Sequence, residues 1–145
     1  MEISRTNWLA VLASAVAGTV LGFLWYGVLF LDKWAAGNGL RMDEAAHKMY
    51  KGDVELPQDM SPMLVNVVVL AIYAFLMDWL LRRQGVSTYQ GGATTGAVIG
   101  LISLLGIFIS NMYAFRPMSL SWVDGPYVLI LFTVIGAIMG GWQKK

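Results

Sequence analysis

A small group of polar and aromatic residues is the candidate binding site of this sequence. These residues interrupt or border long apolar runs, where an amide or a charge is unfavourable unless it is paired. Together an amide, a phenol, a guanidinium and a carboxylate can hold a polar ligand by hydrogen bonds and charge. The group consists of Trp25, Tyr26, Lys33, Asn66, Asn111, Arg116, Asp124 and Tyr127.

Catalytic and metal-binding patterns are not found in the sequence. The chain has no cysteine, which excludes disulfides, thiolate catalysis and cysteine ligands to metals. His47 is the single histidine, and neither a nucleophile–base pair nor a glycine-rich phosphate loop accompanies it. A net charge of +1 gives no electrostatic case for nucleic acid. We therefore expect no metal, no cofactor and no nucleic-acid partner, and the pattern favours a non-enzymatic protein.

Composition places the candidate group in a membrane protein. Of the 145 residues, 57% are hydrophobic and 13% are charged, whereas a soluble domain has about 25% charged residues. The apolar residues form four runs, and about 20 helical residues are enough to cross a hydrocarbon core. The sequence therefore predicts one domain over 1–145, an all-α antiparallel up-down bundle of four transmembrane helices. The predicted spans are about 8–31, 63–81, 93–115 and 124–142.

The six tryptophans support four crossings, because tryptophan is enriched at the two membrane–water interfaces. In an up-down arrangement they form two belts, Trp8, Trp79 and Trp142 on the side of the termini and Trp25, Trp34 and Trp122 on the other.

The basic residues are evenly divided between the two sides of the membrane. The side of the termini has Arg5, Arg82, Arg83, Lys144 and Lys145, and the other side has Lys33, Arg41, Lys48, Lys51 and Arg116.

Orientation is predicted from the second connection. Arg82 and Arg83 lie in a very short loop directly at the end of a span, where basic residues favour the cytoplasmic side. The expected location is therefore a bacterial cytoplasmic membrane with both termini in the cytoplasm.

Small residues spaced by four form a stripe on three of the four predicted helices. In lipid, such stripes allow close approach of helix backbones. Beside Ala10 and Ser14, the stripes contain Gly18 and Gly22 on the first helix, Gly92, Gly96 and Gly100 on the third, and Gly136 and Gly140 on the fourth. Packing within one bundle is the favoured interpretation, and a homodimer seam along one stripe is the alternative.

Local signals predict where the helices begin and end. Ser61 and Pro62 suit the start of the second helix, and Gly85 suits its end. Ser87 with Gln90 has the spacing of a capping box for the third helix. The sequence 124–126, Asp-Gly-Pro, suits the start of the fourth.

The connection over 32–61 is long enough to cover the polar end of the bundle. Its apolar residues Met42, Ala45, Ala46 and Met49 share one face of a short amphipathic helix predicted at about 43–51. Such a helix could lie on lipid head groups, cover a pocket as a lid, or contact a partner.

Two possible ion pairs are indicated by spacing. Asp78 is the one acid within a span, and Arg82 lies one turn away on the same face. We expect both side chains to reach water at the interface, which favours a structural role for Asp78 over proton coupling. Arg116 and Asp124 border the third connection and could pair. Asn66 and Asn111 are expected to point into the bundle.

A family resemblance extends over nearly the whole chain through scattered residues. The segment 7–30 followed by Lys33 and Trp34 resembles the beginning of a bacterial membrane family known as domain of unknown function 1761. The turn at 115–117, with residues 120–127 and the closing 136–142, is similar to the second half of that family. The chain differs after Tyr26, where Gly27 and Val28 replace the expected Ser-Pro pair. The resemblance implies four spans and no established activity.

Three functions remain open from the sequence. The favoured one is a small membrane protein that acts through helix packing, self-assembly, or contact with lipid or a partner whose identity the residues do not indicate. The alternative is a small-solute channel or transporter, although the middle of the spans offers only Ser, Thr and Gly as polar lining. The third is a membrane enzyme or lipid binder that uses Tyr26, Lys33 and Arg116 on a head group.

Overall fold

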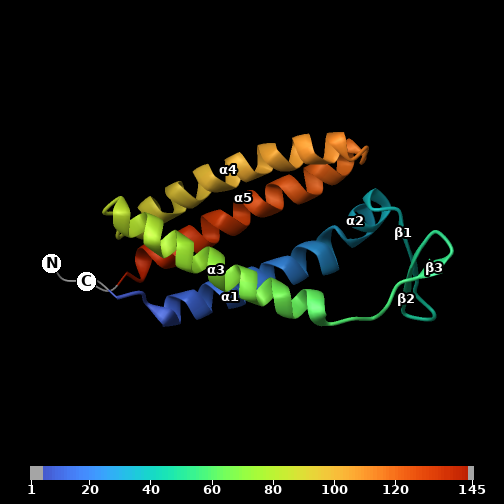
Figure 1. Ribbon diagram of the computed structural model, residues 1–145, viewed down its shortest axis with the longest axis horizontal. Helices are drawn as coiled ribbons and strands as arrows, with labels where there is room; N and C mark the ends of the chain where they lie inside the picture. The colour runs from blue at the N-terminus through green and yellow to red at the C-terminus, as the bar shows by residue number, and fades with distance from the viewer. Residues whose placement is uncertain (1–4, 144–145) are drawn as a thin grey trace.

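The computed structural model describes residues 5–143, which form four long helices and a small three-stranded sheet (Figure 1). The predicted Lys144 and Lys145 of the basic set lie outside the described residues. Each long helix has the length and apolar character needed to cross a membrane, so the predicted fold class is confirmed. The helices are α1 (Trp8–Gly22), continued by the π-helical η1 (Phe23–Leu29), then α3 (Ser61–Arg83), α4 (Tyr89–Tyr113) and α5 (Met118–Gly141).

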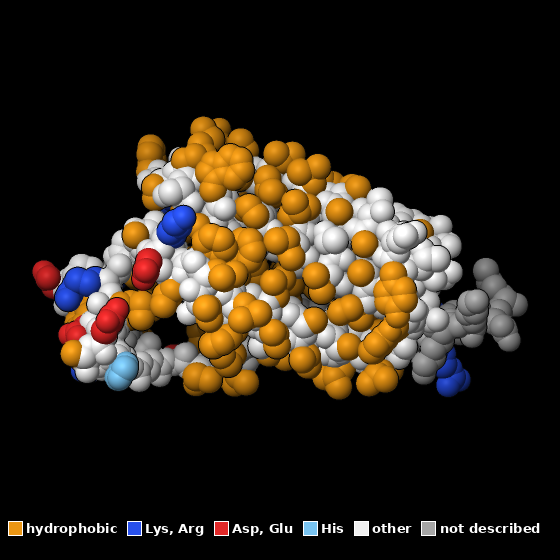
Figure 2. Space-filling view, turned by 180° about the vertical axis from the view of Figure 1, so that it is seen from behind, with side chains coloured by type: hydrophobic (Ala, Val, Ile, Leu, Met, Phe, Trp, Pro, Cys, Tyr) orange, Lys and Arg blue, Asp and Glu red, His pale blue; other side chains and the backbone are white. Residues whose placement is uncertain are grey.

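The four helices alternate in direction, so both ends of the described chain lie at one end of the molecule and the sheet lies at the other (Figure 1). We call the end with the sheet the polar end. Trp8 begins α1 and Trp142 follows α5, while Trp25 and Trp34 lie toward the sheet. Hydrophobic side chains cover the helical body, and charged side chains gather on the sheet (Figure 2). This distribution fits a body embedded in lipid and an end in water.

Two helix pairs build the body, α1 with α3 and α4 with α5 (Figure 1). Because α5 also contacts α1 and α3, the core lies among these three helices, and α4 packs mainly on α5. The buried core cluster contains Ala10, Val11, Ala15, Leu70, Ala74, Met77, Leu81, Leu131, Ile135 and Met139.

The glycine stripes of α4 and α5 face each other. A Cβ atom added to Gly96 would lie 2.0 Å from the carbonyl oxygen of Phe132, and one added to Gly136 would lie 2.2 Å from that of Gly92. The first stripe is also used within the chain, since Gly18 is covered by Leu70 and Leu131. All three stripes therefore serve packing inside the bundle.

The helix ends agree with the sequence at α3. Ser61 is its first residue, and Gly85 follows it with φ +68 in the left-handed region. Val86 N–H donates to the carbonyl of Leu81 at 2.9 Å, which completes a Schellman motif. At the start of α4, the cap is Thr88, one residue after the predicted Ser87; its hydroxyl accepts from Gly91 N–H.

The start of α5 differs from the prediction. The helix begins at Met118, so Asp124, Gly125 and Pro126 lie inside it. Pro126 has no N–H to donate to the carbonyl of Trp122, four residues earlier, but the helix continues through it. Transmembrane helices tolerate proline where neighbouring groups compensate. Asp124 therefore lies within a helix, beside other helices.

The prediction of a short helix at about 43–51 is wrong. This segment forms the antiparallel strands β1 (Leu40–Asp43) and β2 (Lys48–Lys51), to which β3 (Val54–Glu55) is added, in the order β1-β2-β3. The Asp43 carboxylate accepts from Ala45 N–H and Ala46 N–H at 3.1 Å, and His47 has φ +51. These features fix a turn where the apolar spacing indicates a helix. The connection does contain one helix, α2 (Leu31–Gly37), directly after η1.

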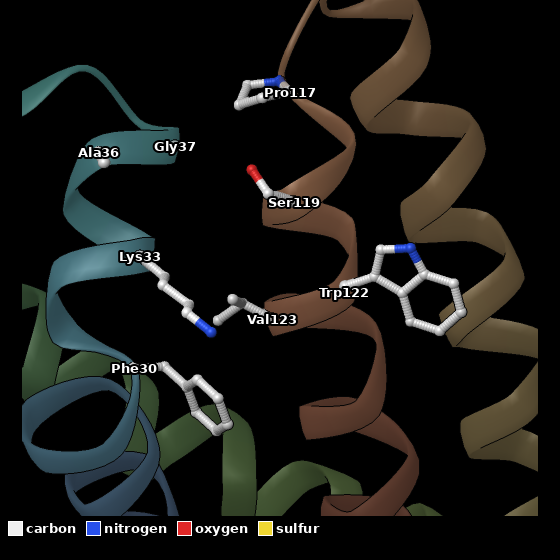
Figure 3. A pocket seen from close by; sticks show the side chains of 8 residues that line it. All are labelled: Phe30, Lys33, Ala36, Gly37, Pro117, Ser119, Trp122 and Val123. Carbon is white, nitrogen blue, oxygen red and sulfur yellow. The ribbon is translucent and has the colours of Figure 1, made fainter.

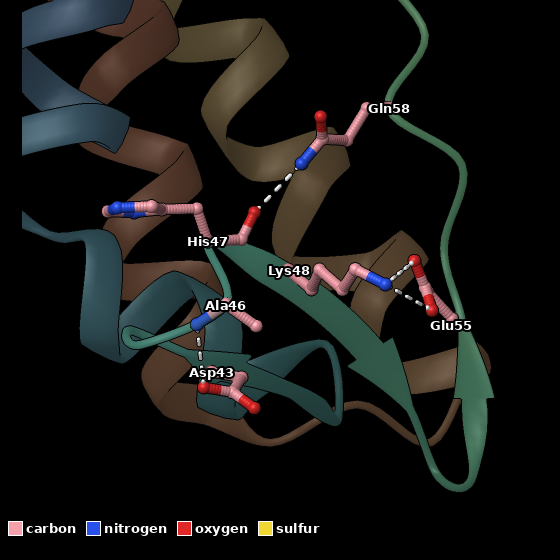
Figure 4. Close-up of polar contacts among 6 residues, drawn as sticks. All are labelled: Asp43, Ala46, His47, Lys48, Glu55 and Gln58. Atoms are coloured by element: carbon pink, nitrogen blue, oxygen red, sulfur yellow. Dashed lines mark hydrogen bonds and ion pairs between the residues drawn. The ribbon is translucent and has the colours of Figure 1, made fainter.

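Polar contacts hold the sheet and its exit. Lys48 Nζ lies 2.9 Å from Glu55 Oε1, and Gln58 Nε2 donates to the carbonyl of His47 at 2.8 Å (Figure 4). The hydrogen bond and charge of Glu55 raise the pKa of Lys48 above its ordinary value. Hydrogen bonds from Ser61 lower the pKa of Asp59, just before α3. The sheet is thus an ordered element outside the bundle.

Candidate functional site

At the polar end, η1 is joined to α5 by hydrogen bonds. The Tyr26 hydroxyl donates to Asp124 Oδ1 at 3.0 Å, and Trp25 Nε1 donates to the carbonyl of Val123 at 2.9 Å. Both donors come from the π-helical segment, where Phe30 N–H bonds the Trp25 carbonyl at 2.9 Å and the helix then breaks. A π-helical turn changes the direction of successive side chains and is frequent at functional sites. The π-helical segment forms with Gly27 and Val28 in place of the Ser-Pro pair that the family resemblance suggests.

Asn111 joins α4 to this network. It is 5% exposed, and its Nδ2 donates to Ser121 Oγ at 3.1 Å. Its side chain also interacts with the carboxylate of Asp124. Ser121 and Asp124 lie three residues apart on α5 and so share a face. The inward orientation predicted for Asn111 is correct. Its partner Ser121 was not among the predicted site residues, although Ser121 lies three residues before Asp124 and so shares a helix face with it.

A cleft opens beside this network, and we call it the lateral cleft. It has a volume of about 640 Å³ and lies where η1 and α2 meet the first turns of α3. Within it, Tyr26 contacts Trp34 and Tyr127 edge-on, with ring centroids 6.0 and 4.8 Å apart. The lining residues are Thr19, Gly22, Phe23, Tyr26, Gly27, Trp34, Pro62, Met63, Asn66 and Tyr127.

A second cavity of about 640 Å³ lies between α2 and α5. Lys33 extends across it from α2 toward Val123, with Nζ 5.9 Å from the centroid of the Phe30 ring (Figure 3). We call it the lysine cavity. Its lining residues are Phe30, Lys33, Ala36, Gly37, Pro117, Ser119, Trp122 and Val123.

The structure divides the predicted site residues among these places. Tyr26, Asn66 and Tyr127 line the lateral cleft, and Trp25, Asn111 and Asp124 form the network behind it. Lys33 belongs to the lysine cavity. Trp34 and Thr19 are cleft residues that the candidate group omitted.

Two expectations about this group are wrong. Asn66 does not point into the bundle: it is exposed on the first turns of α3, at the mouth of the lateral cleft. Arg116 does not pair with Asp124, because no ion pair joins them among residues 5–143. The reason is the turn after α4, where Phe115 has φ +54 and Arg116 N–H bonds the Asn111 carbonyl at 2.9 Å. This turn leaves Arg116 exposed.

The predicted pair at the opposite end does form. Arg82 Nε lies 2.8 Å from Asp78 Oδ2, and Arg82 Nη2 donates to the carbonyl of Arg5 at 2.8 Å. Asp78 is 1% exposed, so the expectation that it reaches water is wrong. It lies on the buried side of α3, and its Oδ1 has no hydrogen-bond partner in the part of the chain that the structure describes. This pair ties the beginning of α1 to the end of α3.

These features are those of a membrane protein: four helices are long and apolar enough to cross a bilayer, and a polar network lies beside the lateral cleft and the lysine cavity at one end. The chain belongs to the family described as "Protein of unknown function (DUF1761)", whose model matches residues 9–140. No curated protein and no solved structure matches the chain. The matched range contains every residue of the lateral cleft and of the network behind it.

Proposed function

We propose that this protein is a non-enzymatic membrane protein that binds an amphiphile, such as a lipid, in the lateral cleft. The main support for this proposal is the cleft itself. Its volume of about 640 Å³ falls within the range of about 300–1,000 Å³ typical of small-molecule sites. Its lining combines aromatic rings with a few polar groups, as such sites do. Because Asn66 and Met63 belong to the first turns of a span, the cleft faces the interfacial region of the bilayer.

The same geometry gives little support to a channel. The residues buried among α1, α3 and α5 at mid-depth include Leu70, Ala74, Leu131 and Ile135, which are apolar. A pathway for ions or polar solutes needs a polar lining through the middle of the membrane. The polar network ends at the level of η1, so it supports binding at one end.

The proposed location is the cytoplasmic membrane of a bacterium, with both termini in the cytoplasm. Arg82 and Arg83 end α3 directly before a short turn, and basic residues close to a span end favour the cytoplasmic side. The sheet and the lateral cleft would then lie on the outer side. The three glycine stripes are occupied within the chain and do not support a homodimer seam there.

Native mass spectrometry of the purified protein tests lipid binding. Asn66→Trp places a large ring at the mouth of the cleft, where the native side chain is exposed, and should remove the bound lipid or reduce it severalfold. Val68→Trp is the matched control, because Val68 is 59% exposed on the same helix and does not line the cleft. Equal lipid retention by the two variants would contradict the proposal.

A further inference from the structure

Three hydroxyl groups line the lateral cleft, and those of Tyr26 and Thr19 already donate their protons within the chain, while the third belongs to Tyr127. The Tyr26 hydroxyl donates to Asp124, and the Thr19 hydroxyl donates to the carbonyl of Ala15 at 2.8 Å. A hydroxyl has one proton and two lone pairs, so both groups can only accept from a ligand. The donors that line the cleft and could serve a phosphate or a carboxylate are the Tyr127 hydroxyl, the Trp34 indole N–H and the Asn66 amide, which are all neutral, whereas the strong hydrogen bonds to such anions come from charged donors.

Aromatic rings form much of the remaining wall. Phe23, Tyr26, Trp34 and Tyr127 line the cleft from η1, α2 and α5. The faces of aromatic rings carry partial negative charge and attract a cation within about 6 Å of the ring centre. Rings from three different elements in one small cavity are an arrangement that suits an alkylated ammonium group.

A partly buried negative charge lies directly behind the cleft. Asp124 Oδ1 lies one hydrogen bond, 3.0 Å, behind the Tyr26 hydroxyl, and no lysine, arginine or acidic residue lines the cleft itself. Arg116 acts on Asp124 only from a distance and is exposed, so solvent screens it. Lys33 lines the separate lysine cavity. Charge in a low-dielectric site acts over several ångströms.

We propose that the lateral cleft selects amphiphiles with a cationic ammonium head. The aromatic rings and the hydroxyl oxygens of Tyr26 and Thr19 would contact the head, and the negative charge of Asp124 behind Tyr26 would attract it. This inference rests on the proposed function and specifies its ligand. The apolar tail would leave the cleft past Met63 and Phe23, which are 51% and 66% exposed. Asp124 acts here through its charge and through the orientation of Tyr26, so it is a positioning residue.

Two short amphiphiles of opposite charge test this selection. Octyltrimethylammonium and octanesulfonate, both below their micelle concentrations, are titrated into the full chain in nanodiscs of neutral lipid. Binding is read from the Trp34 indole N–H signal in NMR spectra, assigned with Trp34→Phe. We expect the ammonium to bind about tenfold more tightly than the sulfonate.

Three variants assign the preference to Asp124. Asp124→Asn should bring the two affinities within about twofold of each other, and Asp124→Glu should keep the preference for ammonium. Asp32→Asn is the matched control, because Asp32 is an exposed acid of α2 outside the cleft, and it should change nothing. The five other indole signals report whether each variant keeps its fold.

The outcomes separate the two proposals. Equal affinities in the wild type, or a preference that survives in folded Asp124→Asn, would overturn the inference while leaving amphiphile binding intact. If neither compound moves the Trp34 signal, the proposed function fails together with the inference.

Discussion

The two helix pairs of the bundle are held together in different ways. Between α4 and α5, glycine places backbone against backbone, as at Gly96 and Phe132. Between α1 and α3, side chains fill the interface: Leu70 covers Gly18, and Trp8 stacks on Phe75 with ring centroids 6.1 Å apart. At the end of α3, Arg82 also donates to the carbonyl of Arg5, just before α1. A backbone contact cannot adjust, whereas a side-chain contact can change rotamer.

This difference bears on where a ligand can bind. The lateral cleft lies where η1, α2 and the start of α3 meet, on the side-chain-packed half of the molecule. The polar network connects that half to α5, which packs backbone to backbone against α4. The rigid pair therefore serves as the support, and the adjustable pair carries the cleft.

The largest effect is expected from Gly96→Ala. Its Cβ would meet the carbonyl oxygen and carbon of Phe132 at 2.0 and 2.7 Å, so the helices must separate. We expect a loss of at least about 2 kcal/mol in the free energy of unfolding, the scale of a severe overpacking change. Reversible unfolding with SDS in mixed micelles measures it.

Gly106→Ala is the matched control on the same helix, because nothing lies within 4 Å of the added Cβ. It should leave stability unchanged or raise it by at most about 1 kcal/mol through helix propensity. Equal losses in the two variants would show that the backbone contact does not hold the pair.

Arg82→Met should have the next largest effect on stability. It leaves the buried Asp78 carboxylate without its cation, which we expect to destabilise the protein by about 2 kcal/mol at neutral pH. The double variant Arg82→Met with Asp78→Leu should recover most of the loss, because it removes the unpaired charge. Failure of the double variant to recover would mean that Arg82 stabilises the protein through contacts other than the Asp78 pair, such as its bond to the carbonyl of Arg5. The same SDS titration measures all three proteins.

Gly18→Ala should have a smaller effect than Gly96→Ala, although both add one methyl group at a buried stripe. Its Cβ would meet Leu70 Cδ2 at 2.7 Å, a flexible side-chain end that can move. We expect a loss of about 1 kcal/mol. Combining it with Leu70→Val should restore part of that loss. An effect as large as that of Gly96→Ala would remove the distinction between the two pairs.

The smallest effect concerns the sheet, which no helix pair supports. Glu55 raises the pKa of Lys48, so the pair contributes its stability below the ordinary lysine pKa and loses it as pH rises through the raised value. NMR titration of the Lys48 side chain should show this pKa falling in Glu55→Gln. An unchanged titration would mean that the contact does not persist in solution.

Most of the bundle could be predicted because the apolar runs and the glycine spacing act locally. The rotation of α3 could not, since this helix is apolar on nearly all sides and its sequence does not say which face meets α1. Asn66 was therefore placed inside and lies outside. The start of α5 was missed because Pro126 suits a helix start in water but is tolerated within a transmembrane helix.

The site shows the same limit. Tyr26 and Asp124 are 98 residues apart, and their hydrogen bond depends on the π-helical turn of η1, which residue types do not signal. The sheet was missed because the Asp43 turn and the left-handed His47 override an apolar spacing that also fits a helix. Spacing finds elements, whereas contacts between elements depend on rotation and local backbone geometry.

The central claim is that the chain crosses the membrane four times and places the sheet opposite both termini. Since the chain has no cysteine, single cysteines at Thr6, Asp53, Gln84, Phe115 and Gln143 can be labelled in intact cells with a membrane-impermeant maleimide. The account predicts that Asp53→Cys and Phe115→Cys react from outside, whereas the other three react only after the membrane is opened. Labelling of Thr6→Cys and Gln143→Cys from opposite sides, or of Asp53→Cys and Gln84→Cys from the same side, would contradict it.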